Sequence, residues 1–546
     1  MKNPSAFLSI ILLSLLFSSS INAQEEPLQK GLDAITKESV QAQLEFLSSD
    51  WMEGRGTGEK GEFLAADYLA SMLQFMGIEG AGDEEWTRPS REQRWSGIRS
   101  EKYTSYFQNI YLTRYLESAT QLSILFENTS KEISFNEQTD FSVYDYPMNI
   151  KITSSLVFVG YGFVDEASGY DDFKGIDVKD KIIVRLSGYP GHLDTTSVGY
   201  QKFHKEERYF EYYMRRDKNK TALKKGAAAV IEISNEDYSK YWANKNEFEK
   251  ISVNENPRSP IYEHNLELPT DTIKDALLQI YPTKKLVNKL LENQNINVEY
   301  IEKQIASNLK PQSKILKGTK INITYNVKTD IIQARNVLGV IEGENKNDIV
   351  IIGGHYDHLG AIDGFVWNGA DDNASGTVGV WMLAKAFATS GIKPKKTIVF
   401  AAWTGEEIGL FGSEYFADHP YGGSIENIKF YLNFDMISKD SEKDTLKNQA
   451  RMVYTSTYTE LEDITEKNIA DYNLNLDITY KPSEKPRGGS DHASFAAKNV
   501  PVMYFMAGFP TTFHTPKDQT YDVNWGKMVD IIKLSYLNLW EIVNEE

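Results

Sequence analysis

After Asn336 the sequence alternates short apolar runs with helical segments, and this alternation constrains the fold more than any other feature. Four apolar runs predict buried strands, at residues 349–352, 397–402, 430–434 and 500–505. Apolar residues at helical spacing lie between them, and a last apolar-faced helix is predicted at 528–543. Short buried strands that alternate with helices are typical of α/β domains with a largely parallel sheet. We therefore expect a mostly parallel central sheet flanked by helices.

The remainder of the chain is less regular. A helix is predicted from Lys60 to Gly77, because apolar residues recur at helical spacing and a glycine closes the run. The polar stretch 82–102 predicts a long surface loop, and the polar, Lys-rich stretch 293–320 resembles a linker. In the middle of the chain, short strands are predicted at 156–162 and 181–186, and a helix turns at Gly226 into another buried strand.

The first residues resemble a cleaved secretory signal. A lysine near the start precedes an apolar run from 7 to 17, and small and polar residues then lead to Ala23, after which we expect cleavage. The run is shorter than the ~20 apolar residues that span a bilayer. The sequence thus predicts a secreted or periplasmic protein without stable membrane anchoring.

Composition limits the partners and the chemistry. The 59 basic and 77 acidic residues of the 546 give a net charge of −18, which repels phosphate backbones and makes nucleic acid an unsuitable partner. The chain has no cysteine, so it has no disulfide, thiolate metal ligand or cysteine nucleophile. Any metal must therefore be held by Asp, Glu or one of the eight histidines.

Candidate ligands follow nearly every predicted strand of the second half. They are His355 and Asp357, then Asp371 and Asp372, Glu406 and Glu407, Asp435 and His514. Each alone has a plain structural explanation, such as a loop histidine, a helix N-cap or a solvated charge pair. Together they lie at the carboxyl ends of strands, where open α/β sheets bind ligands. Mixed imidazole and carboxylate ligands favour Zn, with Mn or Co also possible, and an adjacent glutamate pair can divide into one ligand and one base.

The motifs around these residues resemble the M28 family of co-catalytic zinc peptidases. They are His-x-Asp at 355–357, Gly-Ala-Asp-Asp-Asn-Ala-Ser-Gly at 369–376, Gly-Glu-Glu-Ile-Gly at 405–409, Asn-Phe-Asp-Met at 433–436 and Ser-Asp-His at 490–492. The segment Met-Glu-Gly-Arg-Gly-Thr-Gly at 52–58, with the helix after it, is also similar to the N-terminal part of that family. The resemblance covers roughly residues 35–115 and 325–546.

The resemblance implies a peptidase with two Zn²⁺ per chain, acting on peptide substrates. By position in the motifs, one metal would be held by His355 and Asp435, and the other by Glu407 and His514. Asp372 would bridge the two metals. The catalytic residues would be Glu406, as general base, and Asp357, which would orient His355. For His358, Asp491 and His492 the resemblance implies a structural role or contact with a ligand, not metal binding.

The middle of the chain resembles the protease-associated (PA) domain that is often inserted in this family. The similarity rests on Phe-Val-Gly-Tyr-Gly at 158–162, the run from Tyr170 to Lys179, and Lys-Gly-Ala-Ala at 225–228. The implied organisation is a signal peptide at 1–23, a discontinuous peptidase domain at 24–147 and 301–546, and a mainly-β inserted domain at 148–300 that carries no catalytic residue.

Two positions depart from the family pattern. Phe513 stands where relatives often have a tyrosine before the last histidine ligand, and Gly489 stands where an arginine often precedes Ser-Asp-His. Arg487 or Tyr504 are candidates to replace them. A secreted aminopeptidase is the leading hypothesis; a carboxypeptidase or dipeptidase, a single-zinc glutaminyl cyclase and a non-catalytic binding protein are the alternatives. The sequence carries no signal for the oligomeric state.

Overall fold

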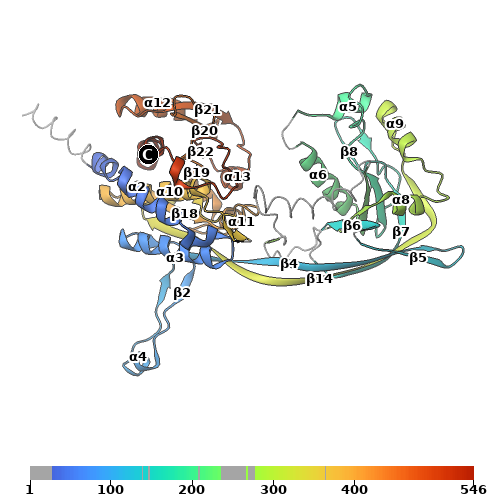
Figure 1. Ribbon diagram of the computed structural model, residues 1–546, viewed down its shortest axis with the longest axis horizontal. Coiled ribbons are helices and arrows are strands. Elements are labelled where there is room, and N and C mark those ends of the chain that lie inside the picture. Colours follow the sequence, from blue (N-terminus) through green and yellow to red (C-terminus); the bar gives the residue numbers. More distant parts are fainter. Residues whose placement is uncertain are drawn as a thin grey trace, which may run out of the picture. The chain divides into compact units, whose positions relative to one another are not determined.

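The computed structural model describes residues 27–137, 139–144, 148–206, 210–234, 266–267, 277–362 and 364–545. The described residues divide into two compact units: unit 1 contains 27–112 and 332–545, and unit 2 contains 113–234 and 266–331. The chain passes between the units within two long strands, β4 (Phe107–Phe126) and β14 (Lys314–Ile341), which Figure 1 shows in blue and yellow-green. The predicted signal peptide lies outside the described residues.

Unit 1 is built on a sheet whose centre is parallel. Its four central strands follow the order β18 (Lys396–Trp403), β15 (Asn345–His355), β19 (Ile428–Phe434) and β22 (Val502–Met506). Every neighbouring pair among these four is parallel. On one side the sheet continues through β14, antiparallel to β18, and β1 (Glu79–Gly80), antiparallel to β14. On the other side β20 (Gln449–Thr455) is antiparallel to β22, and β21 (Asp477–Ser483) is parallel to β20. The predicted mostly parallel sheet is therefore confirmed.

Helices cover both faces of this sheet. One face packs against α2 (Lys37–Leu47), α3 (Lys60–Phe75), α10 (Gly376–Ser390), α12 (Leu461–Asp471) and α14 (Trp525–Asn544), and the opposite face packs against α11 (Phe411–Asp418) and α13 (His492–Ala497). The strand β15 serves both cores, because Val350 and Ile352 lie in the first and Ile349 and Ile351 in the second. This two-sided burial explains why the central strands are continuously apolar.

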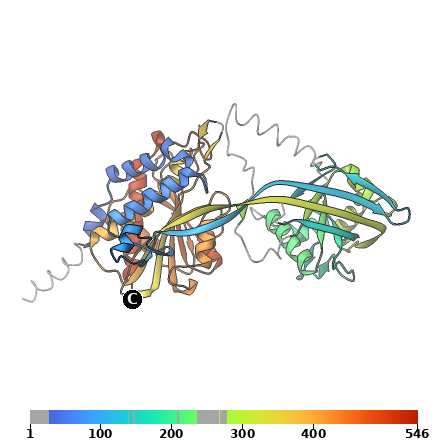
Figure 2. The same ribbon diagram turned by 90° about the horizontal axis from the view of Figure 1, so that it is seen from below.

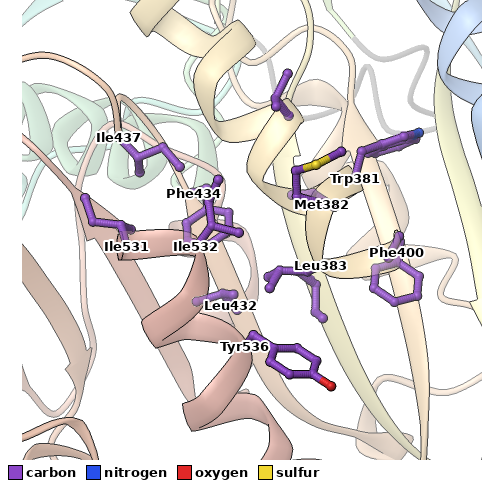
Figure 3. Close-up of a cluster of buried hydrophobic side chains, with 14 of the residues drawn as sticks. Trp381, Met382, Leu383, Phe400, Leu432, Phe434, Ile437, Ile531, Ile532 and Tyr536 are labelled. Carbon is purple, nitrogen blue, oxygen red and sulfur yellow. The ribbon is translucent and has the colours of Figure 1, made fainter. Parts of the chain in front are cut away.

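The larger core packs around α10, the helix that begins just after the candidate ligand Asp372. Figure 3 shows Trp381, Met382 and Leu383 of α10 packed among side chains of the sheet and of α14. The Trp381 indole also donates a hydrogen bond of 3.0 Å to the Leu69 carbonyl of α3. A Cβ added at Gly379 would lie 2.8 Å from Phe434, so the absence of a side chain lets α10 approach the end of β19. This contact places the loop before α10 beside Asp435.

Unit 2 contains a second group of parallel strands, which the long strand β14 joins to the same sheet. Its strands follow the order β7 (Ile150–Phe158), β10 (Ile182–Leu186), β11 (Ala229–Ile233) and β13 (Gln279–Pro282), with β14 antiparallel to β7 and β6 (Phe141–Tyr144) antiparallel to β13. Its helices are α5 (Val198–Phe203), α6 (Phe210–Lys224), α8 (Lys284–Leu290) and α9 (Val298–Asn308). Its remaining short strands are β5 (Lys131–Phe135) and β12 (Leu266–Glu267), which pair with β4, and β8 (Val164–Asp165) and β9 (Tyr170–Asp171), which pair with each other. The predicted turn at Gly226, which has a φ of +81°, lies between α6 and β11. The assignment of residues 148–300 to a PA domain stays a prediction.

Two stretches predicted to be irregular are ordered. The stretch 293–320 contains α9 and the beginning of β14 instead of a linker, because its lysines and asparagines are interspersed with apolar residues such as Ile305 and Leu316, which are buried. The stretch 82–102 lies largely within a hairpin of β2 (Glu84–Trp86) and β3 (Lys102–Thr104), whose tip carries the short helix α4 (Arg91–Trp95). Figure 2 shows the layers of unit 1 from a second direction.

No helix among the described residues combines the length and the apolar character that a membrane span requires.

Candidate metal centre

The carboxyl ends of the central strands of unit 1 bring the candidate ligands together. His355 is the last residue of β15, Glu406 and Glu407 follow β18, and Asp435 follows β19. His514 lies beyond the end of β22, and Asp372 lies in the turn η3 (Ala370–Ser375) that leads into α10. Because the carboxyl ends of parallel strands meet at one edge of a sheet, residues far apart in sequence converge here.

Asp372 lies between the two histidines, and each of its carboxylate oxygens faces a different one. Its Oδ1 is 3.4 Å from Nε2 of His355, and its Oδ2 is 3.0 Å from Nε2 of His514. A further carboxylate accompanies each histidine: Asp435 Oδ1 lies 3.6 Å from His355 Nε2, and Glu407 Oε2 lies 3.1 Å from His514 Nε2. The five residues thus form two adjacent groups that share Asp372.

This donor set fits a pair of divalent cations. Two ligand atoms ~2.1 Å from a tetrahedral Zn²⁺ are themselves about 3.4 Å apart, which matches the spacing within both groups. Two buried polar atoms in the first group, His355 Nε2 and Asp435 Oδ1, have no hydrogen-bond partner among the described residues. A buried polar atom without a partner is costly, and a bound cation would satisfy both atoms.

The two adjacent glutamates have different surroundings. Glu407 is held from two sides, since Oε1 lies 2.6 Å from Nδ1 of His358 and Oε2 lies 3.1 Å from Nε2 of His514. Glu406 lies instead near the first group, with Oε2 3.8 Å from His355 Nε2, and its side chain is 10% exposed against 4% for Glu407. Ligand atoms of His355, Glu406 and Asp435 all lie within 4.8 Å of one another.

Asp357 is buried directly behind these groups. Its carboxylate accepts hydrogen bonds from the backbone amides of Glu406, at 3.1 Å, and Glu407, at 3.4 Å, and from the Thr57 hydroxyl at 3.0 Å. The imidazole Nδ1 of His355 lies 3.2 Å from the Asp357 carbonyl and 3.7 Å from its carboxylate. Asp357 therefore contacts both His355, its predicted partner, and the loop that carries Glu406 and Glu407.

The electrostatics of the cluster are those of crowded carboxylates. Burial raises the pKa of Glu406 well above its usual range, and the neighbouring charges of Glu407 and Asp435 raise it further. Burial alone would lower the pKa of His514, but Asp372 and Glu407 outweigh burial and raise it to about 10. Burial likewise opposes the charge of His355, yet Glu406 and the aspartates raise the pKa of His355 well above its usual value. Negative charge thus exceeds positive charge inside the cluster, which favours cations.

Four residues hold the cluster in place. Asp371 was predicted as a candidate ligand, whereas no role was predicted for Asp518, Lys439 and Arg55. Asp371 accepts hydrogen bonds from the Ser438 amide and hydroxyl, at 2.8 and 2.7 Å, and so joins η3 to the loop after Asp435. Asp518 accepts from the backbone amides of both Asp371 and Asp372 and forms an ion pair of 2.9 Å with Lys439, which is buried as well. These contacts come from segments more than 60 residues apart, so sequence spacing could not have predicted them.

The fourth residue, Arg55, belongs to the N-terminal motif at 52–58, for which no role was predicted. Its buried guanidinium donates hydrogen bonds to four carbonyls, those of Leu47, Tyr356, Asn368 and Gly369. It thus ties the motif to the loop after β15 and to the residues just before η3. His358, which was predicted to be structural or to support a ligand, contacts Glu407 and is buried beside the cluster.

The two departures from the family pattern have identifiable surroundings. The Phe513 ring stacks on His514, with ring centroids 3.8 Å apart, and offers no hydrogen-bond donor. Tyr504 is 7% exposed and stacks on His492 at 4.6 Å. Burial and the charges of Asp435 and Glu406 raise the pKa of Tyr504 well above its usual value, so its hydroxyl stays a donor. Arg487 is exposed.

Comparison with known proteins finds a family model that matches the second half of this chain. Residues 336–537 match the model of peptidase family M28. Leucine aminopeptidase 2 of Trichophyton equinum is 30% identical over 36% of this chain and 38% of its own length. The leupeptin-inactivating enzyme 1 of Streptomyces exfoliatus is 28% identical over 36% of this chain and 41% of its own length. The chain thus spans less than half the length of these relatives.

Among solved structures, an aminopeptidase from Aneurinibacillus sp. strain AM-1 is 19% identical, with a TM-score of 0.49 over 94% of this chain and 95% of its own. The matched sequence region contains the strands β15, β18, β19 and β22 and every candidate ligand from His355 to His514. The similarity to peptidase family M28 thus covers residues 336–537, the part of this chain that contains the candidate ligands.

Proposed function

We propose that this chain is an aminopeptidase that binds two Zn²⁺ and removes N-terminal residues from peptides. His355 and Asp435 would hold one ion, Glu407 and His514 would hold the other, and Asp372 would bridge them. The observation that carries the proposal is the position of Asp372, whose two oxygens face two different histidines at 3.4 and 3.0 Å. A carboxylate that serves a solvated ion pair has no need of two histidine partners on opposite sides.

Two ions bound in this way would polarise a peptide carbonyl and lower the pKa of a water molecule. Glu406 would be the general base: it would accept the proton of that water and pass it to the departing amine. Asp357 would position the site: it accepts hydrogen bonds from the backbone amides of Glu406 and Glu407 and contacts His355. It would thus hold the base and the ligands in place. In place of the tyrosine absent at 513, Tyr504 would offer its hydroxyl to the developing oxyanion.

We also propose that the protein acts outside the cytoplasm, because its first 23 residues have the pattern of a secretory signal. A mature protein isolated from its native host should begin at or near Gln24, as mass spectrometry of the intact chain would measure. A mature chain that keeps Met1 would contradict export by cleavage.

The activity is tested with purified protein and a matched pair of substrates. Because relatives at 30% identity are named leucine aminopeptidases, leucine p-nitroanilide and its N-acetyl derivative are the first pair. The proposal expects release from the free amine only, a metal content near two Zn per chain, and loss of activity after chelation that Zn²⁺, Mn²⁺ or Co²⁺ restores.

The other outcomes separate the alternatives. Cleavage of N-blocked peptides from their carboxyl end would identify a carboxypeptidase, and cleavage confined to dipeptides would identify a dipeptidase. Formation of pyroglutamate from an N-terminal glutamine, with a single bound Zn, would identify a cyclase. Full activity after exhaustive removal of metal would refute the two-metal site, and metal-loaded protein without any activity would favour a binding protein.

A further inference from the structure

The hairpin between β2 and β3 folds as an ordered arm with no core of its own. We define the arm as residues 84–104, which Figure 1 shows leaving the body of unit 1 below α3. Glu84, Glu85 and Trp86 pair with Thr104, Tyr103 and Lys102, and the ladder continues through a 2.8 Å hydrogen bond from the Thr87 amide to the Glu101 carbonyl. At the tip, Ser90 and Gln93 form a complete capping box for α4.

These local bonds are accompanied by little burial, since Pro89 is the one buried residue of the arm. No residue of α4 is buried, and residues 90–104 are exposed throughout. An isolated two-stranded hairpin is marginal in water, and a helix of five residues is too short to persist by propensity alone. Among the described residues, the arm therefore has the hydrogen bonds of a folded element but little of the apolar contact that would stabilise it.

The arm displays the apolar surface that such a contact requires. Trp95 is 81% exposed, Trp86 61%, Ile98 50% and Tyr103 45%. A monomer rarely leaves several large apolar side chains exposed on one short element, and aromatic and arginine side chains are enriched where proteins bind one another. Arg91 lies over the Trp95 ring, 5.4 Å from its centroid, so both kinds of side chain are combined at the tip.

Charge identifies the kind of partner. Between residues 87 and 100 the arm carries four arginines, Arg88, Arg91, Arg94 and Arg99, against one acidic residue, Glu92. The whole chain has a net charge of −18, so the remainder of the molecule is more acidic still. The end of the arm, residues 87–100, is therefore basic and aromatic, and on an acidic body it is complementary to the body of an identical molecule. Two copies can then exchange arms about a two-fold axis, which closes the assembly.

An anionic membrane is the other surface that would attract arginine and tryptophan. It would also repel the acidic body of this chain, and a lipid surface offers no backbone partners to the free edges of β2 and β3. A second protein chain satisfies the apolar surface, the charge and the strand edges together. We propose that the arm is a dimerisation element that docks on a second copy of this chain. This proposal does not depend on the peptidase activity.

The test measures the mass of the full chain in solution. Sedimentation equilibrium at micromolar concentrations should give twice the monomer mass for the wild type. Trp95→Ser should raise the dimer dissociation constant at least about tenfold, as expected for a central tryptophan of an interface. The double reversal Arg91→Glu with Arg94→Glu should do the same by repelling the acidic partner. A variant in which residues 87–101 are replaced by Asn-Gly, a two-residue turn that joins the paired residues Trp86 and Lys102, should be monomeric.

The matched control is Trp51→Ser, because Trp51 is also 81% exposed but lies outside the arm. It should leave the dimer unchanged, and circular dichroism should show that all variants remain folded. A wild-type monomer at every concentration would overturn the proposal, as would a dimer that survives the arm replacement. Binding of the monomer to vesicles of phosphatidylglycerol through the arm would assign the arm to a membrane instead.

Discussion

Glu406 and Glu407 are adjacent in the chain, but their contacts separate them. Glu407 is fixed by His358 and His514, whereas Glu406 has neither partner and is the more exposed of the two. A ligand gains from being fixed by neighbours, because its oxygen must stay at one distance from the metal. A base that receives and returns a proton must instead reach the reacting water. The contacts thus support the roles that the motif implies.

The first prediction therefore compares Glu406→Gln with Glu407→Gln. Glu406→Gln keeps the size of the side chain and removes the proton acceptor, so kcat should fall by about 10²–10⁴ while KM and bound zinc stay near wild type. Glu407→Gln should lose zinc, because a neutral amide is a poor ligand. Steady-state kinetics and elemental analysis of the same preparations measure both effects. If Glu406→Gln loses the metal and Glu407→Gln keeps it, the two roles are exchanged.

Glu62 is a fully buried carboxylate beside the loops that carry the candidate ligands. It accepts hydrogen bonds from the Gly58 amide at 2.5 Å, the Tyr356 hydroxyl at 3.2 Å and the Thr404 hydroxyl. It therefore links the loop after β15 to the loop after β18. Burial raises the pKa of Glu62 to about 8.

The second prediction concerns the pH dependence that follows. A carboxyl whose pKa is raised in the folded state binds a proton that the unfolded chain has released. The contribution of Glu62 to stability is therefore fully present below about pH 4.5 and is lost as the pH rises to 8. The upper limit of this loss is on the order of 5 kcal/mol. Urea unfolding at pH 5 and pH 8 should show a smaller loss in Glu62→Gln than in the wild type. Parallel pH profiles for the two proteins would contradict the buried charge.

At the scale of elements, the contact between α10 and β19 determines where the loop before α10 lies. Gly379 is a helical glycine at which a Cβ would lie 2.8 Å from Phe434 and 3.0 Å from Ile437. Phe434 directly precedes Asp435, so any shift of the helix away from the strand is transmitted to a proposed ligand. Gly526, in the first turn of α14, is a helical glycine with open space, since its nearest neighbouring atom is 3.8 Å away.

The third prediction is that alanine at these two glycines changes the stability of the protein in opposite directions. Alanine in a helix is favoured over glycine by about 1 kcal/mol, so Gly526→Ala should stabilise the protein or leave it unchanged. Gly379→Ala should destabilise it by about 1–2 kcal/mol, because overpacking outweighs helix propensity, and its affinity for zinc should fall. Chemical denaturation and zinc titration measure the two effects. Stabilisation by both substitutions would show that α10 can move without cost.

At the scale of the whole molecule, the proposed ligands all belong to unit 1. Ligands bound only to the folded state stabilise it, by about 2.7 kcal/mol when their concentration is 100 times the dissociation constant. Unit 2 has its own parallel strands, β7, β10, β11 and β13, and its own hydrophobic cores, so its packing does not depend on the metal.

The fourth prediction follows from this division. Removal of metal should increase hydrogen–deuterium exchange in peptides from the loops after β15, β18 and β19, where ordered strand ends meet repelling carboxylates. Peptides from β10 and β11 of unit 2 should exchange at unchanged rates. Mass spectrometry of digested protein, with and without chelator, gives the comparison in one experiment. Equal increases in both units would mean that metal stabilises the chain as a single cooperative body.

The sequence by itself determined the fold class of unit 1, because buried parallel strands must be apolar on both faces and are therefore visible as short runs such as 349–352. It also determined which residues follow those strands, and hence that His355, Glu406 and Asp435 would meet at one edge of the sheet. The stretches 82–102 and 293–320 were predicted wrongly, because polar and charged residues hid short alternating patterns.

Only the tertiary structure decided how the cluster is held. Arg55 reaches carbonyls up to 314 residues away, and Asp518 binds the amides of Asp371 and Asp372 from 146 or 147 residues further along the chain. Hydrogen bonds between loops leave no periodicity in a sequence, since each depends on the path of two backbones rather than on spacing within one. For the same reason, the separate surroundings of Glu406 and Glu407 emerge only when the chain is folded.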